Sequence, residues 1–356
     1  MTIDLEKVFV SPEAAIRDII ACIDRNGCGI ALVMDRERRL ISTVTHGDIR
    51  RAIAAGHSLD TAVTDWNMYK GESYQQPVTA PVGMDRPALL RFMQEQYVRQ
   101  LPLLDSAGRV VDLVLMRDFG DIDTLPVTAV IMAGGFGSRL RPLTDHMPKP
   151  LLPIAERPIL DWIIEGLRHA GIRQIIVTTY YKAEMIQGHL ENGERFGVQI
   201  EYLHEDRLSG TAGALALVQD WSQPLLVING DILTRVDFRS MFDYHQEHHA
   251  DLSVALREYH FQIPYGVVEM EGVYITAIKE KPSTTVFVNA GIYILSPSIQ
   301  GYVTKGEFLD MPDLIKRAMA DNRTVVGFPV HEYWLDIGQL AQYEQAQNDA
   351  QSWVGN

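Results

Sequence analysis

A glycine-rich stretch near the middle of the chain constrains the fold more than any other feature. Residues 133–144 read Ala-Gly-Gly-Phe-Gly-Ser-Arg-Leu-Arg-Pro-Leu-Thr, and Pro148-Lys149-Pro150 follows shortly after. The stretch comes directly after the apolar run 127–132, whose branched and small residues predict a buried parallel strand. A strand that ends in a tight glycine turn is typical of an α/β protein with a ligand at the carboxyl edge of its sheet.

The glycines of this loop make it suited to binding phosphate. Gly134, Gly135 and Gly137 let backbone N–H groups come close to phosphate oxygens, where a side chain would block contact. Arg139 and Lys149 add two cations that bracket the loop. We therefore expect the loop to hold the phosphates of a nucleotide.

Two common phosphate-binding loops do not match this stretch. A Walker A loop ends in Gly-Lys-Ser/Thr, whereas Gly137 is followed here by Ser138 and Arg139. A dinucleotide fingerprint needs a third glycine, and Leu140 stands at that position. It also needs an acidic residue after the next strand, and the run 175–181 ends without one.

The order Gly-Gly-x-Gly-Ser-Arg-Leu, followed by Pro-Lys-Pro, resembles the signature of the sugar-1-phosphate nucleotidyltransferases, which more often have Thr in place of Ser138. The resemblance implies a Rossmann-like α/β fold of the GT-A type with a mostly parallel sheet. It implies catalytic roles for Arg139, with the loop amides at the β- and γ-phosphates, and for Lys149 at the α-phosphate. The nucleotide-binding residues of the loop would be Ala133, Gly134, Gly135, Gly137 and Ser138.

A second glycine-containing segment follows the predicted strand 200–203. Its sequence Leu-Ser-Gly-Thr-Ala-Gly-Ala resembles the nucleotide-binding loop of the same family. Gly210, Thr211 and Gly213 would leave a flat slot for a base and ribose, and small residues here are similar to the GTP-using members. Thymidylyl- and uridylyltransferases often place a glutamine in this loop. A tightly packed helix start is the alternative interpretation.

Two aspartates are candidates for holding a metal ion. Asp231 follows the hydrophobic strand 225–228, and Asp336 comes after the apolar strand 325–330. Mg²⁺ prefers oxygen ligands and is usually held by one or two carboxylates together with substrate phosphate. Both positions match the metal-binding aspartates of the family, so the resemblance implies a Mg²⁺ site and a catalytic role for Asp231.

Four further residues resemble the family's sugar-binding positions. Glu280 and Lys281 match its Glu-Lys-Pro motif, in which the Glu meets sugar hydroxyls and the Lys meets the sugar phosphate. Gly266 and Asn289 lie in segments similar to the strands that line the sugar pocket. For an isolated Lys281, a solvated turn is the alternative.

Strands and helices are expected to alternate from residue 127 onward, as in an open, mostly parallel α/β sheet. The apolar spacing predicts helices over 158–170, 183–190, 212–218 and 238–248, and strands over 175–179, 200–203, 225–228, 252–256 and 325–330. His245, His248 and His249 lie on the last of these helices. We interpret them as a solvated polar face and not as metal ligands.

The first third of the chain contains a repeat of β-β-α units, which resembles tandem CBS domains. That family often binds a nucleotide between the repeats and usually dimerises. Thr45 and Asp48 match its phosphate- and ribose-binding pair, and Asp118 matches in the second repeat, where Leu115 replaces the hydroxyl. A purely structural module, with Thr45 and Asp48 capping a helix, is the alternative. We expect a regulatory or dimerising CBS pair over 1–122 and a catalytic domain over 126–352.

Charge and composition exclude several classes of protein. The 356 residues carry a formal net charge of −14, which argues against a nucleic-acid partner. No apolar run approaches the length of a membrane span, and the N-terminus does not resemble a signal peptide. Cys22 and Cys28 lack metal-site spacing, so we expect reduced thiols in a cytoplasmic protein.

A CBS pair joined to this catalytic domain resembles the guanylyltransferases that make GDP-glucosamine for legionaminic acid synthesis. The resemblance implies that GTP and a hexose- or aminohexose-1-phosphate, best matched by glucosamine-1-phosphate, give the GDP-sugar and pyrophosphate. Mannose- or heptose-1-phosphate as acceptor, or UTP or CTP as donor, remain open. So does a nucleotide-sensing regulator with a degenerate catalytic domain. We expect a homodimer or higher homo-oligomer assembled through the CBS domains.

Overall fold

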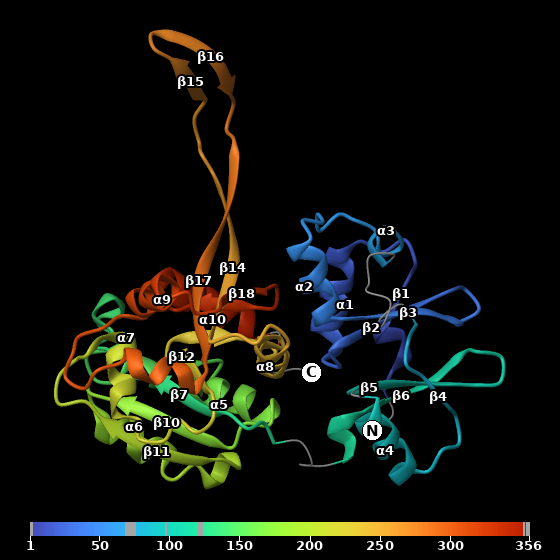
Figure 1. Ribbon diagram of the computed structural model, residues 1–356, viewed down its shortest axis with the longest axis horizontal. Coiled ribbons are helices and arrows are strands. Elements are labelled where there is room, and N and C mark those ends of the chain that lie inside the picture. The colour runs from blue at the N-terminus through green and yellow to red at the C-terminus, as the bar shows by residue number, and fades with distance from the viewer. Residues whose placement is uncertain (1–2, 68–75, 97, 120–123, 352, 354–356) are drawn as a thin grey trace. The chain divides into compact units, whose positions relative to one another are not determined.

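The structure is a computed structural model that describes residues 3–67, 76–96, 98–119, 124–351 and 353 (Figure 1). It divides into two compact units, one that ends at Leu125 and one that begins at Pro126. The predicted domain limits at residues 1, 122 and 352 lie outside the described residues. Each unit is described by itself.

The N-terminal unit consists of two similar halves, each with a three-stranded sheet. In both sheets the first strand pairs in parallel with the second, and the second pairs antiparallel with the third. The elements of the first half are η1 (Leu5–Lys7), β1 (Phe9–Val10), α1 (Ile16–Asn26), β2 (Ile30–Met34), β3 (Leu40–Thr45), α2 (His46–Ala54) and α3 (Val63–Asn67). Those of the second are β4 (Ala80–Pro81), α4 (Arg86–Glu95), β5 (Gln100–Leu104), β6 (Val110–Leu115) and η3 (Met116–Phe119).

The C-terminal unit is built around a seven-stranded sheet. In spatial order its strands are β11 (Gln199–His204), β10 (Gln174–Thr179), β7 (Thr128–Met132), β12 (Leu225–Asn229), β17 (Ser283–Leu295), β14 (Leu252–Gln262) and β18 (Val325–Val330). Only β17 runs against its neighbours, so the predicted mostly parallel sheet is confirmed. Because parallel strands are buried on both faces, β7 and β12 are almost entirely apolar.

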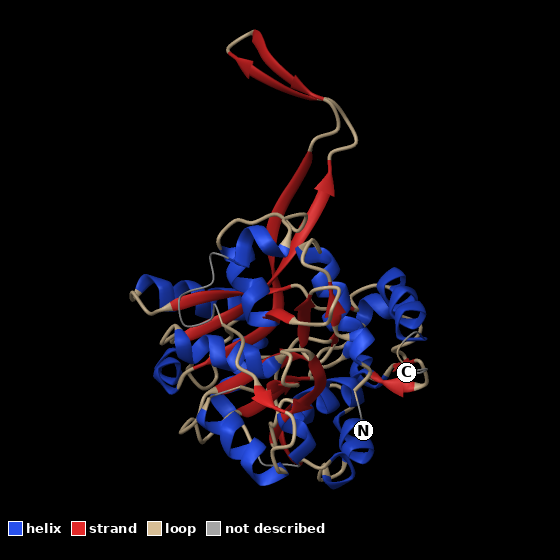
Figure 2. Ribbon diagram, turned by 90° about the vertical axis from the view of Figure 1, so that its right-hand side faces the viewer, coloured by secondary structure: helices blue, strands red, loops and turns tan. Residues whose placement is uncertain are grey.

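Helices cover this sheet (Figure 2). They are α5 (Ile159–His169), α6 (Ala183–Leu190), α7 (Gly210–Gly213), α8 (Phe238–Glu247), α9 (Met311–Ala320) and α10 (Leu340–Gln351). Short 3₁₀ turns lie at η4 (Ser138–Leu140), η5 (Lys149–Leu151), η6 (Glu194–Phe196), η7 (Ala214–Leu217) and η8 (Pro297–Tyr302). The single helix predicted over 212–218 is wrong, because α7 is one turn long and continues as the 3₁₀ turn η7.

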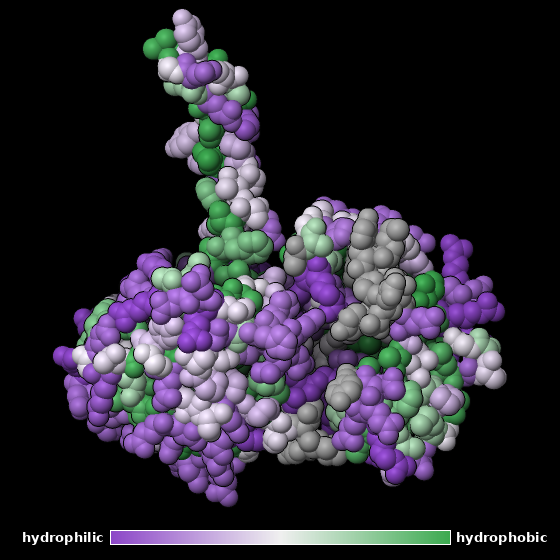
Figure 3. Space-filling model, in the orientation of Figure 1, coloured by the Kyte–Doolittle hydropathy of each residue, from purple (hydrophilic) through white to green (hydrophobic). Residues whose placement is uncertain are grey.

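Three small antiparallel pairs complete the unit: β8 (Pro153–Ile154) with β9 (Arg157–Pro158), β13 (Ile232–Thr234) with β19 (Trp334–Asp336), and β15 (Val267–Glu271) with β16 (Tyr274–Lys279). Strands β14 and β17 continue past the sheet as a long two-stranded arm, and β15 and β16 form its tip (Figures 1 and 2). Large apolar side chains are exposed along this arm, including Tyr265, Val273 and Tyr274 (Figure 3). The sequence prediction ended β14 at Leu256 and missed the arm.

The interpretation of the histidines on α8 as solvated is wrong for His245, which is 1% exposed. Its Nδ1 lies 2.8 Å from Ser253 Oγ, and its Nε2 lies 2.9 Å from Ser296 Oγ. The Ser296 hydroxyl donates to the Ala250 carbonyl, so its oxygen accepts the imidazole N–H. His245 is therefore a neutral, hydrogen-bonded core residue.

Burial lowers the pKa of His245 from 6.5 to about 4. Between pH 6.5 and 4, this histidine is therefore protonated in the unfolded chain but neutral in the folded chain. The free energy of unfolding consequently falls as the pH is lowered from 6.5 to 4. We expect the free energy of unfolding to drop by about 2–3 kcal/mol between pH 6.5 and 4 on account of this group. Urea unfolding at several pH values checks this. The drop should be smaller in His245→Gln and retained in the matched control His248→Gln. Equal pH profiles in all three proteins would contradict it.

No helix in the described part of the chain is long and apolar enough to cross a membrane.

Candidate active site

The glycine-rich loop leaves the carboxyl end of β7, as predicted. Ala133 N–H still donates to the Thr178 carbonyl of the neighbouring strand at 3.0 Å, and the chain then turns through Gly134 and Gly135. Gly137 adopts a left-handed conformation, with φ of 62°, before the 3₁₀ turn that contains Ser138. The Thr144 hydroxyl donates to the Gly137 carbonyl at 2.9 Å and fixes the end of the loop.

Gly137 is also the point where the loop packs on Lys149. A Cβ at this position would lie 3.0 Å from Lys149 Cβ and 3.0 Å from Thr144 Cγ2. The site therefore requires glycine for its positive φ and for the close approach. The close packing of Gly137 against Lys149 therefore couples the position of the glycine-rich loop to that of the lysine.

We expect Gly137→Ala to lower the free energy of unfolding by about 1–2 kcal/mol, because it adds left-handed strain and a steric clash. Gly135→Ala is the matched control, since a Cβ at Gly135 would meet nothing within 4 Å. Urea unfolding of both variants measures the difference. Equal stability of the two would contradict this account of the loop.

Lys149 and Asp231 form an ion pair beside the loop. Lys149 Nζ lies 2.5 Å from Asp231 Oδ2, and the lysine side chain is 9% exposed. Asp231 follows Gly230, whose N–H donates to the Met132 carbonyl at 2.9 Å. A Cβ on Gly230 would come within 2.8 Å of that carbonyl oxygen. This close approach brings the end of β12 against the end of β7 and carries Asp231 to the lysine.

Asp336 reaches the same place through the pairing of β13 with β19. Asp336 is the register partner of Ile232, and Ile337 N–H donates to the Asp231 carbonyl at 3.1 Å. The two aspartates are far apart in sequence, and this pairing brings Asp231, which directly precedes β13, next to Asp336 at the end of β19. Arg139 also lies near Asp336. A Cβ placed on Gly338 would lie 3.8 Å from Arg139 Nη1 and 3.6 Å from Asp336 Oδ1.

The electrostatics of this group of four residues favour a bound cation. Partial burial raises the pKa of Asp336, nearby Asp231 raises it further, and Lys149 and Arg139 oppose the rise. Two carboxylates that repel each other in this way can both bind a hard divalent cation, because such an ion prefers oxygen ligands. Its positive charge would offset the repulsion between them. The carboxylates of Asp231 and Asp336 are thus chemically suited to hold Mg²⁺, and their role as metal ligands stays a prediction.

The second predicted nucleotide loop is packed more tightly than expected. The backbone of residues 307–309 fills the space beside Gly210 and Gly213. A Cβ on Gly210 would lie 2.5 Å from the Leu309 carbonyl oxygen, and one on Gly213 would lie 2.8 Å from the Glu307 carbonyl oxygen. Thr211 N–H donates to Asp310 Oδ1 at 3.2 Å, and its hydroxyl accepts from Met311 N–H at 2.9 Å. These three residues join α7 to the start of α9, and their contact with a nucleotide stays a prediction.

Three of the predicted sugar-binding residues lie on the arm and not at the carboxyl edge of the sheet. Gly266 precedes β15, and Glu280 and Lys281 follow β16 (Figure 1). Glu280 Oε2 would lie 3.1 Å from a Cβ on Gly266, so these two are neighbours. Asn289 lies in β17 where the arm enters the sheet, and its Oδ1 accepts from Gly291 N–H at 3.0 Å.

Sequence reasoning missed two polar residues at this edge of the sheet. Glu205 follows β11 and is 5% exposed. A Cβ placed on Gly134 would lie 2.9 Å from Glu205 Oε1, so this carboxylate lies beside the glycine loop. Thr179 ends β10, and its buried hydroxyl has no hydrogen-bond partner among the described residues. Each comes directly at the end of a strand, which is the signal that points to this position.

In the N-terminal unit, Thr45 and Asp48 cap α2. Thr45 N–H donates to Asp48 Oδ2 at 2.8 Å, and Arg51 pairs with Asp48 Oδ1 at 2.7 Å. Asp118 plays the same part in the second half, where its Oδ2 accepts from Leu115 N–H at 3.0 Å. The structure thus supports the helix-capping interpretation, and nucleotide binding by these residues stays a prediction.

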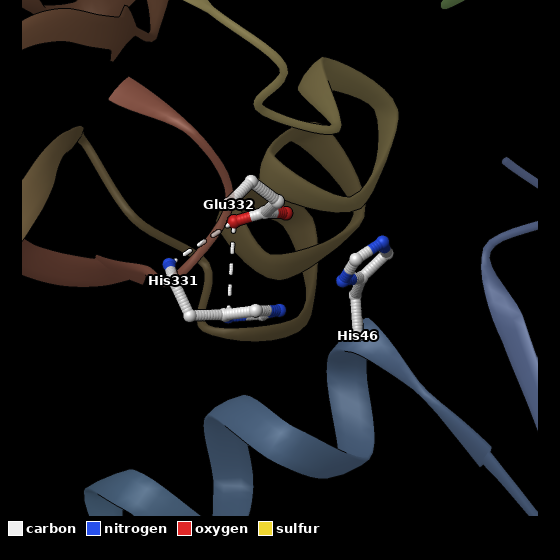
Figure 4. Close-up of side chains that lie close together, drawn as sticks. All are labelled: His46, His331 and Glu332. Carbon is white, nitrogen blue, oxygen red and sulfur yellow. Dashed lines mark hydrogen bonds and ion pairs between the residues drawn. The ribbon is translucent and has the colours of Figure 1, made fainter. Parts of the chain in front are cut away.

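Figure 4 shows the side chains of His46, His331 and Glu332, which do not belong to the predicted sites. In the C-terminal unit, His331 N–H donates to Glu332 Oε2 at 3.1 Å, and His331 Nδ1 lies 3.7 Å from the same oxygen. Glu332 also carries the carbonyl that Arg257 Nη1 binds at 3.0 Å. These contacts hold the segment after β18. His46 belongs to the other unit, where it begins α2.

Comparisons with known proteins show which families the two parts of the chain resemble. The family model described as nucleotidyl transferase matches residues 128–352, and that of the CBS domain matches residues 3–55. The catalytic subunit beta of mannose-1-phosphate guanylyltransferase from Danio rerio is 35% identical over 224 residues, which are 59% of this chain and 61% of that protein. The UTP–glucose-1-phosphate uridylyltransferase of Synechocystis sp. is 30% identical over 243 residues, 61% of this chain and 62% of that protein.

The chain thus spans less than two thirds of the length of these curated relatives. Among solved structures, a Bacillus anthracis protein described as a glucose-1-phosphate thymidylyltransferase superposes with a TM-score of 0.52 at 24% identity. The superposition covers 63% of this chain and 95% of that one, and it supports the fold.

Proposed function

Since the chain belongs to the nucleotidyl transferase family, we propose that it is a sugar-1-phosphate guanylyltransferase. The reaction would join GTP and a hexose- or aminohexose-1-phosphate to give a GDP-sugar and pyrophosphate. The observation that carries this proposal is the convergence of Arg139, Lys149, Asp231 and Asp336 beside a glycine loop at the edge of the sheet. Glucosamine-1-phosphate is our first candidate acceptor, from the combination with CBS repeats.

The chemistry requires little from the protein beyond charge and position. An oxygen of the sugar phosphate attacks the α-phosphorus in line, the new O–P bond forms, and the bond to the β-phosphate oxygen breaks. The attacking phosphate is already ionised near neutral pH, so no protein base is needed. The barrier is the repulsion between two anions, which fixed positive groups reduce.

Each residue of the site has a part in this account. The loop amides with Arg139 hold the β- and γ-phosphates and stabilise the departing pyrophosphate. Lys149, held in place by Asp231, neutralises the α-phosphate. Asp231 and Asp336 would hold Mg²⁺, which supplies Lewis-acid stabilisation of the phosphate charge when bound. Glu280 and Lys281 on the arm would meet the sugar and its phosphate.

We further infer that residues 1–122 and 126–352 act as a regulatory and a catalytic domain in a cytoplasmic homo-oligomer. The paired sheets of the N-terminal unit fit a module that binds an adenine or guanine nucleotide through Thr45, Asp48 and Asp118. Pyrophosphate release in the presence and absence of AMP, ADP and GDP tests this regulation.

The test of the function is pyrophosphate release with Mg²⁺, each of GTP, UTP, CTP, dTTP and ATP, and a panel of sugar-1-phosphates. The panel contains glucosamine-, glucose-, mannose- and heptose-1-phosphate, because one relative is named for mannose-1-phosphate and another for glucose-1-phosphate. We expect GTP with one of these acceptors to give the highest rate. Turnover only with another nucleotide would reassign the donor. No turnover with any pair would favour a nucleotide sensor with a degenerate catalytic domain.

A further inference from the structure

The arm formed by β14 and β17 has one apolar and one mostly polar face. Outside the sheet the two strands stay paired as far as Gln262 and Ser283. Residues opposite each other in such a pair share a face, and successive residues alternate between the faces. One face therefore carries Tyr259, Phe261 and Val286, which are all exposed. The other face carries Glu258, His260 and Thr285 beside Phe287.

The tip of the arm, β15 with β16, repeats this arrangement (Figure 3). One face carries four exposed apolar side chains, those of Val268, Met270, Ile275 and Ile278. On the other face Lys279 Nζ lies 2.6 Å from Glu269 Oε1. A two-stranded hairpin is marginally stable by itself in water, and an exposed apolar patch of this extent marks a surface that another molecule covers.

The arm offers enough apolar area for a stable interface. Its aromatic side chains are between 42% and 76% exposed, and they are Tyr259, Phe261, Tyr265, Tyr274 and Phe287. Since an aromatic side chain covers about 150–250 Å² when it is buried, these rings offer roughly 600 Å². An interface of standard size takes about 800 Å² from each partner, and the exposed aliphatic side chains of the tip supply the remainder.

The charge of the arm favours a second copy of this chain as the partner. Residues 257–288 contain three basic and four acidic side chains, so their net charge is −1, while the whole chain carries −14. Two copies can therefore pack through the arm without the repulsion that their acidic surfaces otherwise cause. A strongly basic or acidic partner would find no complementary charge here. Because both copies carry the same arm, reciprocal packing closes with two-fold symmetry.

The arm also carries Lys281 away from the active site of its own chain (Figures 1 and 2). Asn289, at the base of the arm, lies beside that site, because its bonding partner Gly291 contacts Asn229 at the end of β12. From Asn289 back to Lys281 the extended chain covers roughly 26 Å, at about 3.3 Å per residue. This length is several times that of a lysine side chain, so Lys281 does not reach phosphates at the glycine-rich loop of its own chain.

The side chain of Lys281 is available for an anion. It is exposed, its backbone φ is 44°, and it forms no ion pair with a described residue, whereas Lys279 is paired. The proposed reaction brings a second anion, the sugar phosphate, to a site where Arg139 and Lys149 face the phosphates of the nucleotide. A further fixed cation there would reduce the repulsion between the two substrates.

From these observations we infer that two copies of the chain exchange their arms. Each arm packs its apolar face on the catalytic unit of the partner and places Lys281 at the acceptor side of the partner's active site. The exchange itself follows from the surface of the arm, and the role of Lys281 rests on the proposed function. Each active site is then complete only when a second copy is present.

Complementation between two inactive variants tests this arrangement. Lys149→Ala and Lys281→Ala are co-expressed as full chains with different affinity tags, and assemblies that carry both tags are purified. Each variant alone should lose about 10²-fold or more in pyrophosphate release. The mixed assembly should regain about half of the wild-type rate, because one of its two sites has an intact loop and receives an intact arm. Lys149→Ala combined with Asp336→Asn is the matched control and should regain nothing, since both defects lie in the body of the site.

Cross-linking tests the exchange without any turnover. The photoreactive amino acid p-benzoylphenylalanine replaces Tyr274 at the tip of the arm, or Met319 on α9 as an equally exposed control. After irradiation, the arm position should give a two-chain band on a denaturing gel, with its attachment in residues 126–356 of the partner. The control position should give no such band.

Cross-links from the arm confined to single chains would overturn the exchange. A two-chain band without complementation would overturn the placement of Lys281 in the partner's site. Wild-type protein that turns over no substrate pair but still forms the two-chain band would remove the proposed function and leave the exchange standing.

Discussion

Replacing Lys149 with Ala is expected to lower kcat for nucleotide-sugar synthesis by about 10²–10³-fold. The lysine side chain is 9% exposed and its ammonium pairs with Asp231, so it is preorganised for the charge that develops on the α-phosphate. Its removal also takes away the cation that pairs with Asp231 and opposes the charge repulsion at Asp336, so the thermal midpoint should fall. Steady-state pyrophosphate release and thermal unfolding measure the two effects.

Lys316→Ala is the matched control for this substitution. Lys316 lies on α9 in an exposed pair with Asp313, and the lysine side chain is 74% exposed. An exposed pair of this kind contributes little, so the control should keep both the rate and the stability. Undiminished synthesis by Lys149→Ala would remove the lysine from the mechanism.

Replacing Asp336 with Asn should separate activity from stability. The pKa of Asp336 is raised, so its charged form is disfavoured in the folded protein, and this cost is fully present at neutral pH. The amide removes the repulsion from Asp231, and we expect a higher thermal midpoint than wild type in the absence of metal. Since one oxygen ligand of Mg²⁺ is weakened, kcat should fall by about 10²–10³-fold.

Thermal unfolding with EDTA and with Mg²⁺ measures this separation. Mg²⁺ should raise the midpoint of the wild-type protein and have a smaller effect on Asp336→Asn. The stability gained by the variant should vanish as pH falls below about 3.9, where Asp is protonated in the unfolded chain too. Asp313→Asn on α9 should behave as wild type. A variant that is less stable than wild type without metal and still responds fully to Mg²⁺ would contradict the site.

The sequence predicted the position of the glycine-rich loop because its constraint is local. Glycines after a buried strand fix where the backbone turns, and the structure has β7 end at Met132 as expected. The alternation of strands and helices was also predictable, since each depends on apolar spacing within about ten residues. The proximity of Asp231 and Asp336 needed the family resemblance, because β13 and β19 are three residues each and pair across about a hundred positions.

The arm and the burial of His245 could not be predicted from local sequence patterns, because both depend on the three-dimensional fold. Strand β14 continues from Leu256 to Gln262 after its apolar run has ended, and the mixed polar and aromatic sequence of this second half does not indicate a strand that leaves the sheet. His245 sits among Gln246, Glu247 and His248, which makes its surroundings polar in sequence. Its burial arises from Ser253 and Ser296, which belong to other strands and loops of the fold.

A crystal structure of the protein with Mg²⁺ and a non-hydrolysable GTP analogue tests the charge-neutralising site most directly. We predict the triphosphate along residues 133–138, with Arg139 at its terminal phosphates, Lys149 at the α-phosphate, and the metal between Asp231 and Asp336. A triphosphate bound elsewhere, or a metal held without either aspartate, would contradict it.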